Sequence, residues 1–170
     1  MNFDLHWSIR RYLSGKMNAR RLRAWERARD ANPDLIAEMD RFIVTYVQPR
    51  TEDLARRFSL GLEESARTTD GSPVDAVRSH ARIQLQVSRM FVENMIADGV
   101  DHIRPHLGDR PGRIVTEMVE NHLRKGVGAL AGEILQPARE EAEKIVQDLK
   151  RRGFKAVYSR GGFDLAEEED

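Results

Sequence analysis

The sequence of 170 residues contains no cysteine, which excludes disulfide bonds, thiolate metal sites and thiol nucleophiles. Aromatic residues make up only 6% of it. It has no apolar run of about 20 residues, the length that a membrane-spanning helix needs. Its first residues also lack the basic start and apolar stretch of a signal peptide. We therefore expect a soluble protein, in the cytoplasm or in a virion, that does not associate with a membrane.

Basic and acidic residues balance overall, at 28 each, but they are unevenly placed. Residues 1–30 hold eight basic and three acidic side chains, whereas residues 153–170 hold two basic and five acidic ones. Such asymmetry can steer charged partners, or let copies of the chain meet head to tail. The basic residues are 23 arginines and only five lysines, which fits either affinity for phosphate and carboxylate groups or GC-rich coding.

Apolar residues recur at helical spacing along most of the chain, which predicts a mainly α fold. We expect a helical bundle of six to seven helices with a short C-terminal β-hairpin or strand. Glycine or proline at Ser14-Gly15, Asn32-Pro33, Gln48-Pro49 and Pro137 should separate helices. The predicted parts are an Arg-rich three-helix segment (1–48), a helical core (49–152) and an acidic, hairpin-like tail (153–170).

The helix expected from Ser72-Pro73 to about Ala97 has two apolar faces. One face is lined by Val74, Ala81, Leu85, Val92 and Ile96. The nearly opposite face carries Ile83, Val87 and Met90. A helix that is apolar on two sides is usually sandwiched between others, so we expect this helix at the centre of the core.

Two stretches also fit β-strands, because they are rich in β-branched residues or alternate with a period of two. They are "FIVTYV" at residues 42–47 and "RIQLQVS" at residues 82–88. A strand in either place is the alternative to a helix.

The tail begins after Gly153, where Lys150, Arg151 and Arg152 predict the end of a helix. Alternating residues, Gly161-Gly162 and a second apolar group then predict a hairpin. An isolated two-stranded ribbon is marginally stable, so it should pack on its own helices, pair with residues 42–47, or add a strand to another molecule. We favour the last, which predicts partner contacts at Phe154, Tyr158 and Phe163.

Small residues at Gly128 and Gly132 lie four apart, on one helical face. Another helix could approach closely there, which predicts a second partner-binding site; a flexible or kinked spot is the alternative. Gly126, Gly128 and Ala131 also match the spacing of a dinucleotide-binding fingerprint. That fingerprint needs a preceding strand, and residues 116–125 have a helical pattern, so we predict no cofactor.

Candidate catalytic and metal-binding residues form no familiar motif. Asp98, Asp101, His102 and His106 lie in or beside a proline-containing connector expected at 98–112, and whether its histidines bind a metal stays open. No nucleophile-elbow or phosphate-loop motif is present. We predict a non-enzymatic protein without a metal site.

Four arginines of the second expected helix, Arg20, Arg21, Arg23 and Arg27, form the clearest functional cue. Clustered arginines contact nucleic-acid phosphates, and three consecutive short helices can form a DNA-reading unit. The alternative is a mixed-charge surface, because acids such as Glu26 and Asp30 follow closely.

The segment from residue 6 to residue 42 resembles the N-terminal helical segment of bacterial anti-sigma regulators. Leu13 and Gly15 carry the likeness to the family's Leu-x-x-Gly turn, although only one residue separates them here. Trp25 matches an aromatic near the end of the next helix, and Asn32-Pro33 the break that follows. The zinc-binding histidine and cysteine residues usual in that family are missing. The resemblance implies binding of a protein partner through residues 1–48.

Together these features predict a protein that binds protein, either with copies of itself as a homo-oligomer or within a larger assembly such as a phage particle. The alternative is a nucleic-acid-associated regulator that uses the Arg-rich N-terminal helices.

Overall fold

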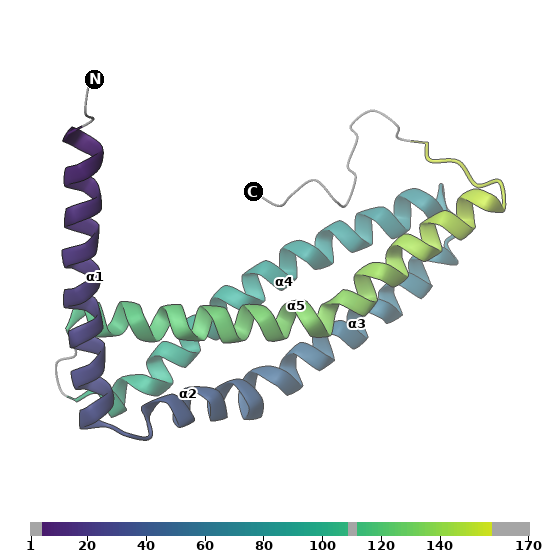
Figure 1. The fold of residues 1–170 in the computed structure, drawn as a ribbon. Coiled ribbons are helices and arrows are strands. Elements are labelled where there is room, and N and C mark those ends of the chain that lie inside the picture. The colour runs from purple at the N-terminus through teal and green to yellow at the C-terminus, as the bar shows by residue number, and fades with distance from the viewer. Residues whose placement is uncertain (1–4, 109–111, 158–170) are drawn as a thin grey trace. The chain divides into compact units, whose positions relative to one another are not determined.

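The computed structural model describes residues 5–108 and 112–157, with side chains described from Asn18 on. Its α-helices are α1 (Leu5–Ala31), α2 (Leu35–Phe42), α3 (Gln48–Ala66), α4 (Pro73–Ile103) and α5 (Arg113–Arg151), in the order that Figure 1 shows. A π-helical segment, η1 (Ile43–Val47), joins α2 to α3, and a 3₁₀ helix, η2 (Arg104–Leu107), follows α4. The described residues contain no β-strand, so the predicted mainly α class is confirmed.

Because α2, η1 and α3 run on as one continuous helix, the described residues form four helices instead of the six to seven expected. Three expected breaks lie inside helices. Ser14-Gly15 lies within α1 and Pro137 within α5. A proline inside a helix costs about 3 kcal/mol. Pro137 is exposed, and its neighbours Leu135 and Ala138 are buried, so packing offsets that cost. The Asn32-Pro33 break is confirmed, since α1 ends at Ala31 and α2 begins at Leu35.

Gln48-Pro49 does not end a helix because a π-helical turn directly precedes it. The Gln48 N–H donates to the carbonyl of Ile43, five residues back. A proline ring normally clashes with the carbonyl four residues before it, and the wider π turn relieves that clash. The helix therefore continues from η1 into α3 through Pro49.

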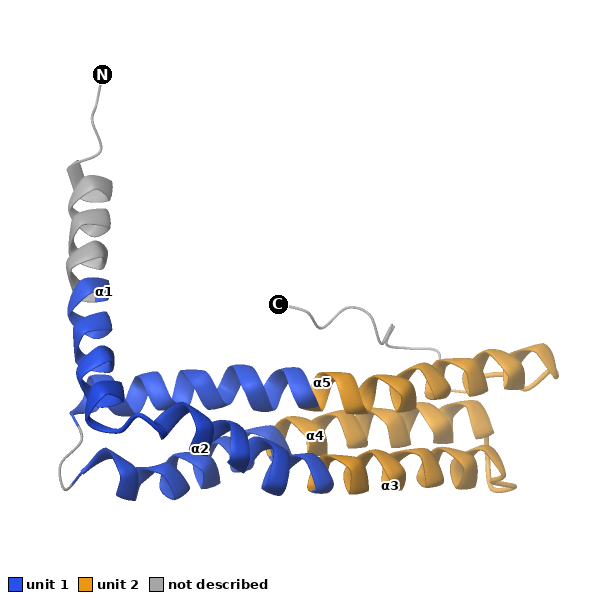
Figure 2. Ribbon diagram, turned by 60° about the horizontal axis from the view of Figure 1, so that its bottom comes forward, with its two compact units in different colours: residues 1–49, 91–130 blue, residues 50–90, 131–170 orange. Residues whose placement is uncertain are grey.

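The chain divides into two compact units, which Figure 2 shows in two colours. Unit 1 comprises residues 1–49 and 91–130, and unit 2 comprises residues 50–90 and 131–170. In unit 1 one buried cluster joins α2, η1, α4 and α5, and Trp25 of α1 packs against it. The cluster consists of Leu35, Met39, Phe42, Ile43, Val47, Met95, Ile96, Ile103, Val119, Leu123 and Val127.

Unit 2 consists of parts of α3, α4 and α5 that lie side by side (Figure 2). Ser59 of α3 donates a hydrogen bond to Glu141 of α5 at 2.7 Å, and a His80 ring nitrogen of α4 lies 3.3 Å from the carbonyl of Phe58. Buried apolar residues line all three segments: Phe58, Leu62, Val74, Val77, Ala81, Ala131, Leu135, Ala138, Ala142, Val146 and Leu149. In α5 the buried residues Ala138, Ala142, Val146 and Leu149 recur at helical spacing, with Ile145 half-buried beside them.

Both stretches that also fitted strands are helical: residues 42–47 lie in α2 and η1, and residues 82–88 in α4. The β-preference of their side chains is weaker than the gain from burying a helical stripe. In the first stretch Phe42, Ile43 and Val47 are buried in the unit 1 cluster. The expected connector at 98–112 also starts later than predicted, because α4 runs on to Ile103.

The C-terminal end of α5 was predicted correctly. Gly153 has a φ of +92°, its N–H donates to the Lys150 carbonyl, and the Phe154 N–H donates to the Leu149 carbonyl. This pair of bonds is a Schellman motif, which favours glycine at the left-handed position. Residues 154–157 are irregular, so no strand begins there. The rest of the expected hairpin, 158–165, lies outside the described residues.

Candidate binding surface

Three apolar side chains of α4 lie exposed on one face in unit 2, and we name them the α4 stripe. Ile83, Val87 and Met90 are 55%, 40% and 61% exposed. Their spacing of four and three residues places them on one side of a helix. The sequence predicted this second apolar face, but the expected sandwich is wrong, since within the described residues no helix covers it.

The opposite face of α4 packs into the molecule as predicted, which explains why the stripe points outward. Val74, Val77 and Ala81 are buried in unit 2. Ser88 is also buried, and its hydroxyl donates to the Gln84 carbonyl at 2.7 Å, which satisfies it. The α4 stripe is thus left over after the helix has buried its main apolar face.

The stretch of α4 that carries the stripe is rich in arginine, and Asp75 and Glu93 are the acids that lie beyond its two ends. Residues 78–90 include Arg78, Arg82 and Arg89 and contain no acidic residue. Arg82 and Arg89 are exposed, and Arg78 is half-buried. A partner that covers the stripe would therefore gain from carrying carboxylates around its apolar residues.

The N-terminus of α4 holds the first residues of the tail. The Ser72 hydroxyl accepts from the Asp75 N–H at 3.3 Å, an N-cap contact, and donates to the Lys155 carbonyl at 2.9 Å. The Val157 N–H donates to the Asp75 carboxylate at 2.7 Å. Residues 155–157 are thus attached to the helix that carries the α4 stripe. Sequence reasoning missed Asp75, although its place three residues after a capping serine was a usable signal.

The predicted contact residues of the tail are described only in part. Phe154 is 42% exposed, and the Arg152 guanidinium lies 5.9 Å from its ring centroid, within the range of a cation–π contact. Tyr158 and Phe163 lie outside the described residues.

The predicted small-residue site does not bring a described helix close. A Cβ placed on Gly128 or Gly132 would meet no atom within 4 Å. The close approaches occur at three other glycines. In unit 2, a Cβ on Gly61 would overlap the ring of His80, and the other two glycines are in unit 1. A Cβ on Gly99 would lie 2.9 Å from atoms of Leu123 and Phe42, and one on Gly126 would lie 2.5 Å from Ile43. Gly128 and Gly132 share one helical face, but they do not form a close contact with another described helix.

The four candidate arginines of α1 divide into two groups. Arg21 forms an ion pair with Glu117 of α5 at 3.4 Å, in unit 1. Arg20, Arg23 and Arg27 are exposed, and at about 100° per residue they share one face of α1. No ion pair links these three to another described residue, and the Arg23 side chain donates to the Ala19 carbonyl. The basic face of α1 thus consists of three of the four predicted residues.

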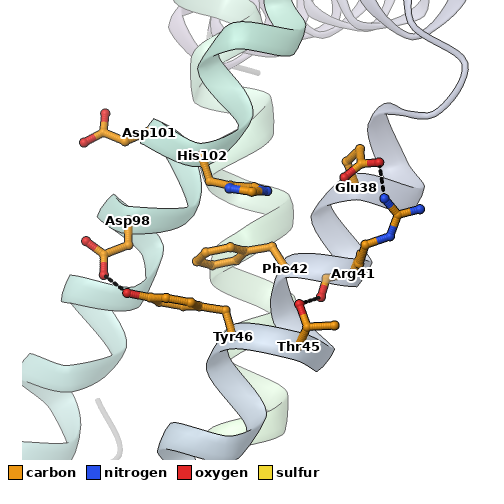
Figure 3. Close-up of a pocket in the computed structure, with 8 residues that line it drawn as sticks. All are labelled: Glu38, Arg41, Phe42, Thr45, Tyr46, Asp98, Asp101 and His102. Carbon is orange, nitrogen blue, oxygen red and sulfur yellow. Dashed lines mark hydrogen bonds and ion pairs between the residues drawn. The ribbon is translucent and has the colours of Figure 1, made fainter.

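A cleft of about 630 Å³ lies in unit 1 between α2, η1 and α4. Figure 3 shows the rings of His102, Phe42 and Tyr46 one above another between these helices. The Phe42 ring centroid lies 4.9 Å from that of Tyr46 and 5.2 Å from that of His102. The remaining lining residues are Glu38, Arg41, Thr45, Asp98 and Asp101.

Most polar groups at this cleft interact with one another or with residues nearby. Glu38 pairs with Arg41, Asp101 pairs with Arg104, and the Tyr46 hydroxyl donates to Asp98 at 3.4 Å. Packing of the rings and these pairs account for the arrangement, so we assign no ligand to the cleft.

The histidines predicted to lie in a connector are on two helices. His102 is on α4 and His106 on η2, with ring centroids 6.4 Å apart. His122 of α5 lies 3.3 Å from the Asp40 carboxylate. Among the described residues, no three metal-ligating side chains come together.

The most strongly perturbed ionisable pair is Glu93 and Arg124, on α4 and α5 in unit 1. Two guanidinium nitrogens of Arg124 donate to the two Glu93 carboxylate oxygens, at 2.5 and 3.0 Å, and one also donates to Glu120. The hydrogen bond from Arg124 lowers the pKa of Glu93, and the same contact raises the pKa of Arg124. This forked pair holds α4 against α5 and is not part of the α4 stripe.

Comparison of the chain with protein-family models, curated proteins and solved structures finds no match. The resemblance of residues 6–42 to anti-sigma regulators therefore stays a prediction, and the turn expected at Leu13 and Gly15 is wrong, because both residues lie in helix α1. In the described part of the chain, no helix combines the length and apolarity needed to cross a membrane.

Proposed function

We propose that this chain is a non-enzymatic protein-binding component that docks a partner on the α4 stripe. The observation that carries the proposal is the exposure of Ile83, Val87 and Met90 on one helical face. Single exposed apolar residues are normal on a protein surface, whereas several together on one face mark interaction sites. Anchors spaced by three and four residues are typical of helix-mediated recognition.

The partner that fits best is a protein segment with apolar residues surrounded by carboxylates. Arg82 and Arg89 lie along one side of the stripe, so acidic residues on that side of a partner would speed the encounter and help fix its orientation. Assembly into a homo-oligomer or a larger particle belongs to the same proposal, as do partner contacts at Gly128, Gly132 and Phe154. The exposed surface at Gly128 leaves room for a partner helix.

Site-specific photo-crosslinking in cells that make the protein tests this proposal. A photoreactive residue at Val87 should give a discrete adduct with another protein, and one at Leu60 should not. Leu60 is a matched control, because it is 59% exposed on α3 of the same unit. Equal adducts from both positions, or none from Val87, would contradict the proposal.

The basic face of α1 supports a second candidate function, binding of nucleic acid. Arg20, Arg23 and Arg27 are exposed on one side of the helix, an arrangement that suits contact with phosphates. The Arg20→Ala/Arg23→Ala/Arg27→Ala variant should then lose duplex DNA or RNA affinity, with a shallower salt dependence. Arg21→Ala is the control, because Arg21 already pairs with Glu117. Weak binding that all four substitutions leave unchanged would remove this candidate.

A further inference from the structure

We infer that the acidic C-terminal segment, residues 158–170, docks on the α4 stripe of its own chain. An exposed apolar face with arginines along one side would be covered best by a segment of complementary chemistry, apolar and acidic. The last thirteen residues contain Phe163 and Leu165 together with five acids, Asp164, Glu167, Glu168, Glu169 and Asp170. Residues 78–90 of α4 supply the opposite charge, with three arginines and no acid.

The attachment of the tail places the start of this segment on α4. The Val157 N–H is bonded to the Asp75 carboxylate, and the Lys155 carbonyl to the Ser72 hydroxyl. At about 100° per residue, Asp75 lies within about a third of a turn of the α4 stripe around the helix axis. The segment that follows Val157 therefore leaves from the helix that carries the stripe.

The length of the segment is sufficient to reach the whole stripe. Asp75 and Met90 are 15 residues apart, so they are separated by about 22 Å along the helix. Thirteen residues span up to about 43 Å when extended. Phe163 and Leu165, six and eight residues beyond Val157, fall within reach of Ile83 and Val87.

Tethering favours docking within one chain over docking between chains. A short flexible tether gives an effective concentration of about a millimolar, so even a segment with millimolar intrinsic affinity would occupy its site about half the time. A second copy at micromolar concentration would compete poorly with it. A partner that binds the stripe has to displace this segment, and that consequence, unlike the docking itself, rests on the proposed function.

Paramagnetic NMR on the full chain tests the docking. Because the chain has no cysteine, Ala166→Cys gives a single attachment point for a nitroxide label. The label should remove at least half of the methyl signal intensity of Ile83 and Val87 and leave that of Leu60 largely intact. Raising NaCl from 0.05 to 0.5 M should restore most of the intensity, because salt screens the charges.

Two further samples separate the alternatives. In the labelled chain, Glu167→Gln/Glu168→Gln/Glu169→Gln should restore the signals of Ile83 and Val87 at low salt without touching either described unit. In a mixture, a nitroxide chain without isotopes should leave the signals of a nitroxide-free isotope-labelled chain unchanged. Broadening in that mixture would show docking by a second copy and overturn the inference, as would undiminished signals in the labelled chain itself. Docking without a Val87 crosslink would leave the inference in place and remove the proposed function.

Discussion

The Val157 N–H donates a hydrogen bond to the Asp75 carboxylate at 2.7 Å, and this contact fixes the start of the C-terminal tail on the first turn of α4. The same turn is capped by Ser72, whose hydroxyl also holds the Lys155 carbonyl. The Ser72 hydroxyl therefore serves both helix capping and tail attachment, whereas Asp75 takes part in capping through its backbone N–H and in tail attachment through its carboxylate.

Removing the acceptor at position 75 should loosen the tail. Asp75→Ala removes a hydrogen bond that contributes about 1 kcal/mol, so exchange of the Val157 amide hydrogen should accelerate roughly fivefold. Hydrogen exchange followed by NMR measures this rate. Asp70→Ala, which removes an exposed acid from the preceding loop, should leave the rate unchanged, and equal acceleration in both variants would count against the contact.

Two glycine-to-alanine substitutions in unit 1 should have opposite effects on stability. Overpacking against Leu123 and Phe42 should cost about 1–3 kcal/mol in Gly99→Ala and outweigh the gain in helix propensity. Gly128→Ala meets no neighbour, so it should stabilise by up to about 1 kcal/mol. Urea unfolding gives both free energies; a destabilised Gly128→Ala variant would show that its surface is already covered.

The Glu93–Arg124 pair should make a small, acid-sensitive contribution to unit 1, because both side chains are exposed and solvent screens the pair. The pKa of Glu93 is lowered in the folded state, so the contribution of the pair is present above the unfolded pKa of about 4.3. It is lost as the pH falls through the lowered folded value. Carboxyl NMR titration should give a pKa for Glu93 below its usual value, and Arg124→Gln should bring it back. A Glu93 pKa that is the same in the Arg124→Gln variant and in the unaltered chain would contradict the pairing.

The α4 stripe should be dispensable for folding. Ile83→Gln, Val87→Gln and Met90→Gln should each change the unfolding free energy by no more than about 0.5 kcal/mol, because the side chains are exposed. Phe58→Ala in the same unit should cost about 3–5 kcal/mol, because Phe58 is 1% exposed. Thermal or urea unfolding compares them, and a large loss in the stripe variants would mean that the stripe is part of the core.

Apolar periodicity predicted the mainly helical class and much of the buried face of α4 correctly, because burial of a 3.6-residue stripe is the dominant local signal. The end of α5 at Gly153 was also predictable, because a left-handed backbone conformation at that position favours glycine. The prolines at positions 49 and 137 led to two wrong predictions of a helix end. A sequence does not show that a π turn will absorb the first clash, or that packing will offset the second.

The candidate site was predicted only in part, because exposure depends on which helices become neighbours. The second apolar face of α4 was visible in the sequence, but two apolar faces fit a sandwiched helix as well as an unpartnered one. The tail contact at Asp75 joins residues 82 positions apart, which no local pattern encodes. Gly128 and Gly132 failed as internal contacts because spacing alone does not specify a partner.

Affinity for the protein identified by crosslinking from Val87 tests the central claim most directly. The Ile83→Gln/Val87→Gln/Met90→Gln chain should bind that partner at least tenfold more weakly than the unaltered chain, and Leu60→Gln should change the Kd less than twofold. Equal affinity of the stripe variant and the unaltered chain would contradict the claim that the α4 stripe is where the partner binds.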